Sequence, residues 1–292
     1  MSNIPDARTV PVPDATLANP RADRVRQVRA LSGRSARSRH GQFLVEGPQG
    51  VREAVRHAPA AVRDVYLTPA AAERYAEIVG DARAAGLYLH VGTPEVLEAM
   101  SPDAQGVLAV VRGEAPTLAD ALAARDPERA GRPLLVAVLA AVRDPGNAGT
   151  VIRAADAAGA DLVVLAGESV DVHNPKVVRS TAGSLFHLPV VAGIPLDAAL
   201  AELRAAGCLV LAADGAGALD LDDLLDDAGS GTAPDLAGPT AWVFGNEAWG
   251  LPEEHRALAD AVVRVPIRGR AESLNLATAA TVCLYASSRA QR

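Results

Sequence analysis

The fold class follows from residues 134–150, which read Leu134-Leu-Val-Ala-Val-Leu139, Ala140-Ala-Val-Arg143 and Asp144-Pro-Gly-Asn-Ala-Gly-Thr150. The apolar run at the start predicts a strand buried on both faces, as in a parallel sheet that helices cover. Further strands are predicted at 161–165, 188–191, 208–211, 241–244 and 261–267, with helices over 151–158, 176–185, 196–206 and 274–287. This alternation predicts an α/β domain with a mostly parallel sheet over residues 133–292.

The first part of the chain also alternates strands with helices, in shorter elements. Strands are predicted at 43–45, 62–67, 87–91 and 107–111, and helices from Asp23, through 51–55, and over 70–85 and 94–100. Residues 33–41 are basic and rich in serine, and they are expected to form a loop. We therefore predict a smaller α/β domain over 21–112. A flexible leader over 1–20, which carries four prolines, and a linker over 113–132 complete the predicted organisation.

The composition is that of a globular protein, with 49% hydrophobic and 22% charged residues. The formal net charge of −7 argues against a protein that coats nucleic acid indiscriminately. Ten arginines nevertheless stand between residues 21 and 63, against three acidic residues, so this end of the chain could bind a polyanion. Lys176 is the only lysine; a genome of high GC content explains that bias without any functional cause.

Cysteine usage and hydropathy exclude several classes of protein. Cys208 and Cys283 lie within apolar runs and are expected to be buried, and no CxxC motif or Cys/His cluster occurs. We therefore predict no metal site. No apolar run approaches the ~18 residues that a membrane helix needs, and no signal-peptide pattern occurs, so a cytoplasmic protein is expected.

Three polar loops follow predicted strands and are the candidate functional site. They are Asp144–Thr150, Gly245-Asn-Glu-Ala-Trp-Gly-Leu251 and Arg268-Gly-Arg-Ala-Glu-Ser-Leu-Asn275. In open α/β sheets ligands bind outside the carboxyl ends of the strands. Taken singly, each loop could be only a turn, and Ser273 or Asn275 could only cap the last helix. Their conjunction, with Arg153 and Glu247 among them, favours a site.

These motifs resemble those of the SpoU (TrmH-like) RNA 2′-O-ribose methyltransferases in order and approximate spacing. The resemblance covers 144–159, 243–251 and 265–275, and Asp144 departs from the Asn that many members carry. Residues 41–54 are similar to the L30e-like RNA-binding domain that precedes the catalytic domain in many members. The resemblance implies a trefoil-knotted domain of the SPOUT type behind an L30e-like domain, with the active unit a homodimer.

The resemblance also implies S-adenosylmethionine as cofactor and assigns roles to residues of the three loops. The main chain at Gly245, Val265, Ile267 and Leu274 is expected to hold the cofactor. The polar active-site positions are expected to be Asn147, Arg153, Glu247, Ser273 and Asn275. The basic cluster Arg34, Arg37 and Arg39 is the candidate RNA contact, with a solvated charged loop as its alternative.

Arg153 is the residue of greatest chemical interest, because the motifs contain no His, Cys or paired carboxylate that could act as a base. A ribose 2′-OH is a poor nucleophile and needs both alignment and help in losing its proton. A guanidinium stays protonated. Our hypothesis is therefore that Arg153 binds the target phosphate and lowers the pKa of the 2′-OH, while Glu247 and Asn147 hold it in place. The alternative is that Arg153 only pairs with Glu247 as scaffold.

Two other classes of protein were weighed. A nicotinamide-dependent oxidoreductase should show GxGxxG after its first strand, and residues 144–150 do not fit that spacing. A non-catalytic RNA-binding assembly factor would not need the polar positions to be intact. The front domain favours 23S rRNA as substrate, with tRNA, or rRNA methylation that confers antibiotic resistance, as alternatives.

Overall fold

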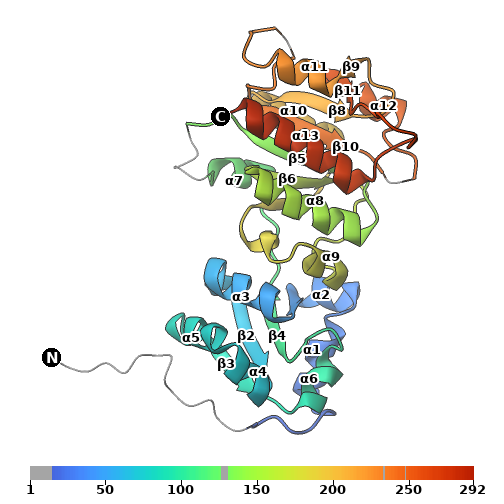
Figure 1. Ribbon diagram of the computed structural model, residues 1–292. Coiled ribbons are helices and arrows are strands. Elements are labelled where there is room, and N and C mark those ends of the chain that lie inside the picture. The colour runs from blue at the N-terminus through green and yellow to red at the C-terminus, as the bar shows by residue number, and fades with distance from the viewer. Residues whose placement is uncertain (1–14, 126–130, 233, 247) are drawn as a thin grey trace, which may run out of the picture. The chain divides into compact units, whose positions relative to one another are not determined.

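The computed structural model describes residues 15–125, 131–232, 234–246 and 248–292, and these divide into two compact units (Figure 1). The first unit comprises the described residues up to 114 together with 173–187, and the second comprises 115–172 and 188–292. The sequence predicted an uninterrupted second domain. Residues 173–187 depart from that expectation, because they fold with the first unit.

The first unit is built on a four-stranded sheet in the order β1-β4-β2-β3. Its strands are β1 (Gln42–Glu46), β2 (Val62–Leu67), β3 (Tyr88–Val91) and β4 (Val107–Arg112). Its helices are α1 (Asp23–Ala30), α2 (Arg34–His40), α3 (Pro48–His57), η2 (Pro59–Ala61), α4 (Pro69–Arg74), α5 (Ala76–Ala84), α6 (Pro94–Met100), α9 (Pro175–Ser180) and η4 (Ser184–Phe186). Strand β4 pairs antiparallel with β1 and β2, and β2 pairs parallel with β3. Apolar residues of α3 and α5 cover one face, and those of α1 and α6 cover the other.

Helix α2 replaces the loop that the sequence predicted over 33–41. The polar composition hid it, because its stability comes from one buried side chain rather than from an apolar face. Arg37 is only 6% exposed, and its guanidinium donates to the carbonyl oxygens of Leu31 (3.1 Å) and Ser32 (2.7 Å). These carbonyls follow the end of α1, where backbone acceptors need partners from outside the helix. Gly41, in the left-handed region at φ +58°, ends α2.

Residues 173–187 join the first unit through three kinds of contact. Val178 of α9 is buried in the core that α3 and α5 share with the sheet. Arg179 forms ion pairs with Glu46, which is almost wholly buried, and with Asp103 at 3.0 Å. His173 stacks on Phe43, with ring centroids 4.3 Å apart. The helix predicted over 176–185 is shorter than expected and breaks into α9 and η4, which Ala182 and Gly183 separate with positive φ angles.

The second unit contains a seven-stranded sheet in the order β7-β6-β5-β10-β8-β11-β9, and each pair of neighbours is parallel. Its strands are β5 (Leu135–Ala140), β6 (Leu162–Ala166), β7 (Val190–Ile194), β8 (Leu209–Ala213), β9 (Leu219–Asp220), β10 (Thr240–Phe244) and β11 (Ala261–Arg264). Its helices are α7 (Leu118–Ala123), α8 (Pro145–Ala158), α10 (Leu196–Ala205), α11 (Leu221–Asp226), α12 (Glu253–Arg256) and α13 (Leu276–Ala290). The predicted mostly parallel α/β domain is confirmed.

Helices cover both faces of this sheet. Alternate residues of β10 point to opposite sides, since Ala241 and Val243 pack with α7 and α10, whereas Trp242 donates a hydrogen bond to Ser287 of α13 at 2.9 Å. Helices α8 and α13 lie side by side (Figure 1). Helix α7 falls within the predicted linker, and its Leu118 and Ala121 are buried in the core of the second unit.

The predictions about the leader, the cysteines and membrane helices can also be compared with the structure. Residues 1–14 of the predicted leader lie outside the described part of the chain. In the remainder of the leader, residues 15–20, Leu17 pairs with Gly92 in an isolated bridge. Cys208 and Cys283 are buried as predicted, and burial raises the pKa of each thiol to about 12. None of the helices in the described part of the chain combines the length and the apolar character that a bilayer-spanning segment requires.

Candidate active site

The three polar loops meet because of the strand order. Strands β5, β10, β8 and β11 are consecutive neighbours and run parallel, so their carboxyl ends lie along one edge of the sheet. Asn147 lies in the first turn of α8, which follows β5 and begins within the predicted loop 144–150; the loop after β10 begins at Gly245, and the chain after β11 leads to Ser273 and Asn275. In the sequence, 94 residues separate the first loop from the second and 16 separate the second from the third.

A cavity of about 340 Å³ lies at this edge. Residues from the ends of β8, β10 and β11 and from the start of α13 line it: Ala213, Asp214, Gly215, Phe244, Gly245, Asn246, Ala248, Gly250, Val265, Ile267, Glu272, Ser273, Leu274, Leu276 and Ala279. All four residues predicted to hold a cofactor, Gly245, Val265, Ile267 and Leu274, are among them. Its volume falls in the range of about 300–1,000 Å³ that is typical of small-molecule sites.

Gly245 stands where the main chain passes closest to itself. A Cβ atom on this residue would collide with the carbonyl group of Gly250 and lie only 2.6 Å from the nitrogen of Leu251. The obstacle is backbone, which cannot rotate aside as a flexible side chain would. The loop after β10 can therefore fold back to Gly250 only if position 245 has no side chain.

Asn246 fixes this second loop to the end of β5. It is 6% exposed, and its Nδ2 donates to the carbonyl oxygen of Ala141 at 2.8 Å while its Oδ1 accepts from the nitrogen of Ala248 at 2.9 Å. Backbone hydrogen bonds of 2.9 Å in both directions join Asn246 and Gly250. Arg143 also lies over the ring of Trp249, at 5.5 Å from its centroid. Asn246 was not among the residues predicted from the sequence; the signal for it was its position between a strand and a Gly-rich turn.

The first and third loops are joined by two asparagine side chains. Nδ2 of Asn275 donates to Oδ1 of Asn147 at 3.1 Å. Each loop also caps a helix: the carboxylate of Asp144 accepts from the nitrogen of Asn147 at 2.7 Å, and Oδ1 of Asn275 accepts from Ala277 at 2.9 Å. Asn275 can therefore cap α13 through its amide oxygen and bind Asn147 through its amide nitrogen at the same time.

Arg153 and Ser273 are both exposed, and Ser273 lies in the wall of the cavity. Arg153 is on α8, three residues after Thr150, the last residue of the first loop. Within the described ranges, no hydrogen bond or ion pair engages its guanidinium. Glu247, which was predicted to hold Arg153, lies outside the described residues.

The end of β8 contributes residues to the cavity that were not predicted from the sequence. Asp214 and Gly215 line the cavity, and the nitrogen of Asp214 donates to the carbonyl oxygen of Val263 at 3.0 Å. The carboxylate of Asp214 lies 3.5 Å from Arg256, which also binds Glu253 at 2.5 Å. The hydrogen bond that Arg256 donates to Glu253 is the main reason why the pKa of Arg256 is raised. The loop that begins with Asp214 and Gly215 is thus a fourth loop of the site. An Asp-Gly pair directly after a buried strand was the sequence feature that could have predicted it.

Two larger cavities lie away from these loops. One of about 760 Å³ is in the first unit, between β2, β3 and neighbouring loops, and one of about 710 Å³ is in the second unit near Asp161 and the carboxyl terminus. Neither is lined by a residue of the three loops. The strand-end cavity is smaller, but it alone of these three coincides with the predicted site.

The predicted nucleic-acid contact divides into exposed and buried members. Arg34 and Arg39 of α2 are exposed. Arg37 is buried and bonded to backbone carbonyls, so its predicted contact with RNA does not fit the structure. Helical spacing explains the difference for Arg39, which is two positions after Arg37 and therefore does not face the same side of α2.

Comparison with known proteins gives a consistent assignment for both units. Residues 134–285 match the SpoU rRNA Methylase family, and residues 22–109 match an MRM3-like substrate binding domain. A 23S rRNA (uridine(2479)-2′-O)-methyltransferase of Streptomyces viridochromogenes is 35% identical, covering 95% of this chain and 93% of its own. A 23S rRNA (guanosine(2553)-2′-O)-methyltransferase, RlmP, of Bacillus subtilis is 31% identical, covering 90% and 94%.

A solved structure extends the likeness to three dimensions. The AdoMet-bound rRNA methyltransferase of Sinorhizobium meliloti superimposes with a TM-score of 0.76 at 27% identity, covering 94% of this chain and 97% of that one. The likeness therefore spans both units and includes a relative crystallised with the cofactor in place.

Proposed function

Because the chain belongs to the SpoU rRNA methylase family, we propose that it transfers a methyl group from S-adenosylmethionine to a ribose 2′-OH of 23S rRNA. The observation that carries the proposal is the cavity at the ends of the adjacent strands β10, β8 and β11, whose wall contains every residue that the family resemblance assigned to the cofactor. The curated relatives described above act on 23S rRNA, at a uridine in one and a guanosine in the other. They therefore support the class of RNA and not a particular nucleotide.

The residues of the cavity fit S-adenosylmethionine. Val265, Ile267 and Leu274 offer an apolar wall for the adenine ring, and Asp214 and Glu272 offer carboxylates to polar and cationic groups. Gly245 has no side chain and so lets the loop after β10 fold back to Gly250, and both glycines line the cavity. When bound, the cofactor supplies a methyl group made electrophilic by its sulfonium.

The chain's own residues provide alignment and charge. Arg153 binds the phosphate next to the target ribose and lowers the pKa of the 2′-OH, so that the proton leaves to phosphate or water. Asn147 and Asn275 join the loop before α8 to the loop before α13, which fixes the RNA-facing groups relative to the cofactor cavity. Ser273 and Glu247 are proposed as further polar groups of the active site.

The test is methyl transfer to defined RNA. We expect full-length protein with radiolabelled S-adenosylmethionine to label 23S rRNA at one position that then resists alkaline cleavage, because a methylated 2′-oxygen cannot attack the neighbouring phosphate. Transcripts of 16S rRNA and tRNA serve as controls. Binding of the cofactor without transfer to any RNA would indicate a non-catalytic RNA-binding factor instead.

The first unit is proposed to bind the rRNA, through Arg34 and Arg39 among other residues. Changing both to Gln is expected to weaken binding of an rRNA fragment and to lower the slope of log K against log salt concentration by about 1.4–1.8, since each lost phosphate contact removes about 0.7–0.9. Fluorescence anisotropy at several salt concentrations measures the slope. The double variant Arg56→Gln/Arg83→Gln on α3 and α5 is the matched control, and equal slopes for both variants would remove α2 from the interface.

The assembly and threading of the second unit are also proposed. We propose a homodimer through this unit, supported by Val282 and Tyr285, which are large apolar side chains of α13 that are 39% and 49% exposed. The placement of β10 between β5 and β8, with β11 beyond β8, is compatible with the trefoil knot that the resemblance implies. A cytoplasmic location is proposed because the proposed substrate is ribosomal RNA.

A further inference from the structure

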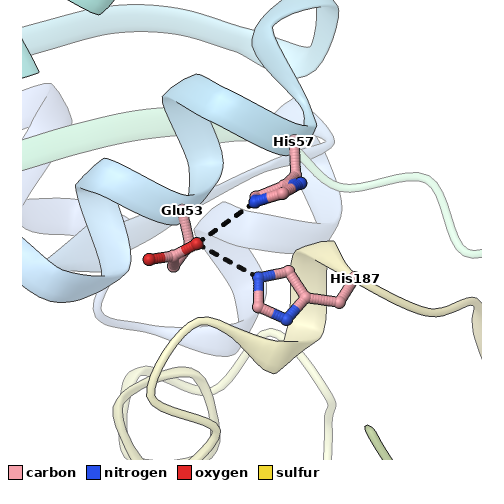
Figure 2. Close-up of side chains that lie close together, drawn as sticks. All are labelled: Glu53, His57 and His187. Carbon is pink, nitrogen blue, oxygen red and sulfur yellow. Dashed lines mark hydrogen bonds and ion pairs between the residues drawn. The ribbon is translucent and has the colours of Figure 1, made fainter. Parts of the chain in front are cut away.

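Two histidines and a glutamate meet on the surface of the first unit, whereas the proposed active site belongs to the second unit. Oε2 of Glu53 lies 3.3 Å from Nε2 of His57 and 3.2 Å from Nε2 of His187. Figure 2 shows the carboxylate pointing between the two imidazole rings. The ring centroids of the two histidines are 4.6 Å apart and their planes meet at 70°, so the two rings lie edge to face beside the carboxylate.

These distances are those of ligands around one metal ion. Zinc binds His nitrogen and carboxylate oxygen at about 2.0–2.2 Å, and in a tetrahedron the ligand atoms then stand about 3.3–3.6 Å apart. The two nitrogen–oxygen distances of 3.2 and 3.3 Å lie at the short end of this spacing. All three ligand atoms lie within 4.8 Å of one another. If the two histidine nitrogens moved closer by about an ångström, the three atoms would form one face of a tetrahedron.

The fold builds the cluster from two distant segments. Glu53 and His57 are four residues apart in α3, which places both on one face of the helix. His187 directly follows η4, in the segment that joins the first unit from between β6 and β7. Gly183 lets this segment approach α3, because a Cβ there would lie 2.8 Å from the Cβ of Glu53 and would collide with its Cγ. The contact that brings His187 to Glu53 thus depends on a residue without a side chain.

We propose that Glu53, His57 and His187 bind one divalent zinc ion, with solvent at the fourth position. Imidazole nitrogen and carboxylate oxygen form a set of borderline ligands that suits zinc, and a set of three protein ligands is common for it. The ion ties residues 173–187 to α3. The sequence predicted no metal site because the three positions form no recognisable spacing; only folding brings position 187 to positions 53 and 57.

Calorimetric titration of the full-length, tag-free protein with zinc chloride tests the proposal. We expect one ion per chain with a dissociation constant in the micromolar range or below. Glu53→Gln, His57→Gln and His187→Gln should each weaken binding at least tenfold, whereas His40→Gln, which changes an exposed histidine elsewhere in the same unit, should leave it unchanged. Far-UV circular dichroism and a thermal unfolding curve that match those of the wild type show that each variant is folded.

Hydrogen exchange separates the three-ligand site from binding to α3 alone. Zinc should slow amide exchange in residues 173–187 of the wild-type protein and have no such effect in His187→Gln. The proposal is overturned if the wild-type protein binds no zinc. It is equally overturned if His187→Gln binds zinc as tightly as the wild type, or if zinc leaves exchange in 173–187 unaltered.

Discussion

The Gly245→Ala variant is expected to lose affinity for S-adenosylmethionine by about a hundredfold or more, equivalent to about 2.7 kcal/mol. The added methyl group meets the backbone of Gly250 and Leu251 and no flexible side chain. The loop after β10 must therefore move away from its pairing with Asn246, and Gly245, Asn246 and Gly250 all line the proposed cofactor cavity. Isothermal calorimetry of the purified variant measures the loss.

The matched control for this variant is Gly269→Ala in the third loop. A Cβ at Gly269 meets nothing within 4 Å, and its φ angle is not positive, so the same chemical change is accommodated there. We expect its cofactor affinity to stay within about twofold of wild type. Thermal unfolding of both variants shows whether Gly245→Ala disturbs more than the loop. Wild-type affinity in Gly245→Ala would place the cofactor elsewhere.

The Arg153→Lys variant is expected to lower kcat for methyl transfer by about 10²–10³-fold, the range found when one group that stabilises developing charge is removed. Lysine keeps the positive charge but lacks the planar fork that grips a phosphate at two points. Because Arg153 does not line the cofactor cavity, affinity for S-adenosylmethionine should change less than twofold. Single-turnover methylation and cofactor calorimetry provide the two measurements.

Two further variants distinguish this role from a scaffold pair with Glu247. Arg289→Lys makes the same substitution on α13 at an exposed position and should leave turnover unchanged. If Arg153 served only to pair with Glu247, Glu247→Gln would reproduce the loss and both variants would unfold at lower temperature. Loss of cofactor binding in Arg153→Lys would contradict the assignment outright.

The second unit was largely predictable because its signals are local. Buried parallel strands are continuous apolar runs, and each of the strands at 135–140, 162–166, 209–213 and 240–244 overlaps a predicted one. The candidate loops were recognisable because glycine and asparagine stand directly after such runs. The order of the strands could not be predicted from any local pattern. This order places the end of β8, with Asp214, between the loops that follow β10 and β11.

The first unit exposed the limits of local patterns. Helix α2 has a polar sequence and is held by Arg37, whose partners Leu31 and Ser32 precede it. The cluster of Glu53, His57 and His187 depends on a contact across more than 120 residues. In both cases the decisive interaction is one side chain meeting a distant or non-periodic partner, and periodicity carries no information about such a meeting.

The interrupted chain path of the first unit has a consequence for how the protein can be divided. A fragment ending at residue 114 would lack Val178 from its core and Arg179 beside the buried Glu46. A fragment starting at residue 115 would carry those residues without the sheet that covers them. The polypeptide passes from one unit to the other three times, so neither the front half nor the back half of the chain contains a complete unit. Cutting the gene once yields two incomplete products, and recombination that exchanged the front half alone would have to bring along a second, non-adjacent stretch of coding sequence.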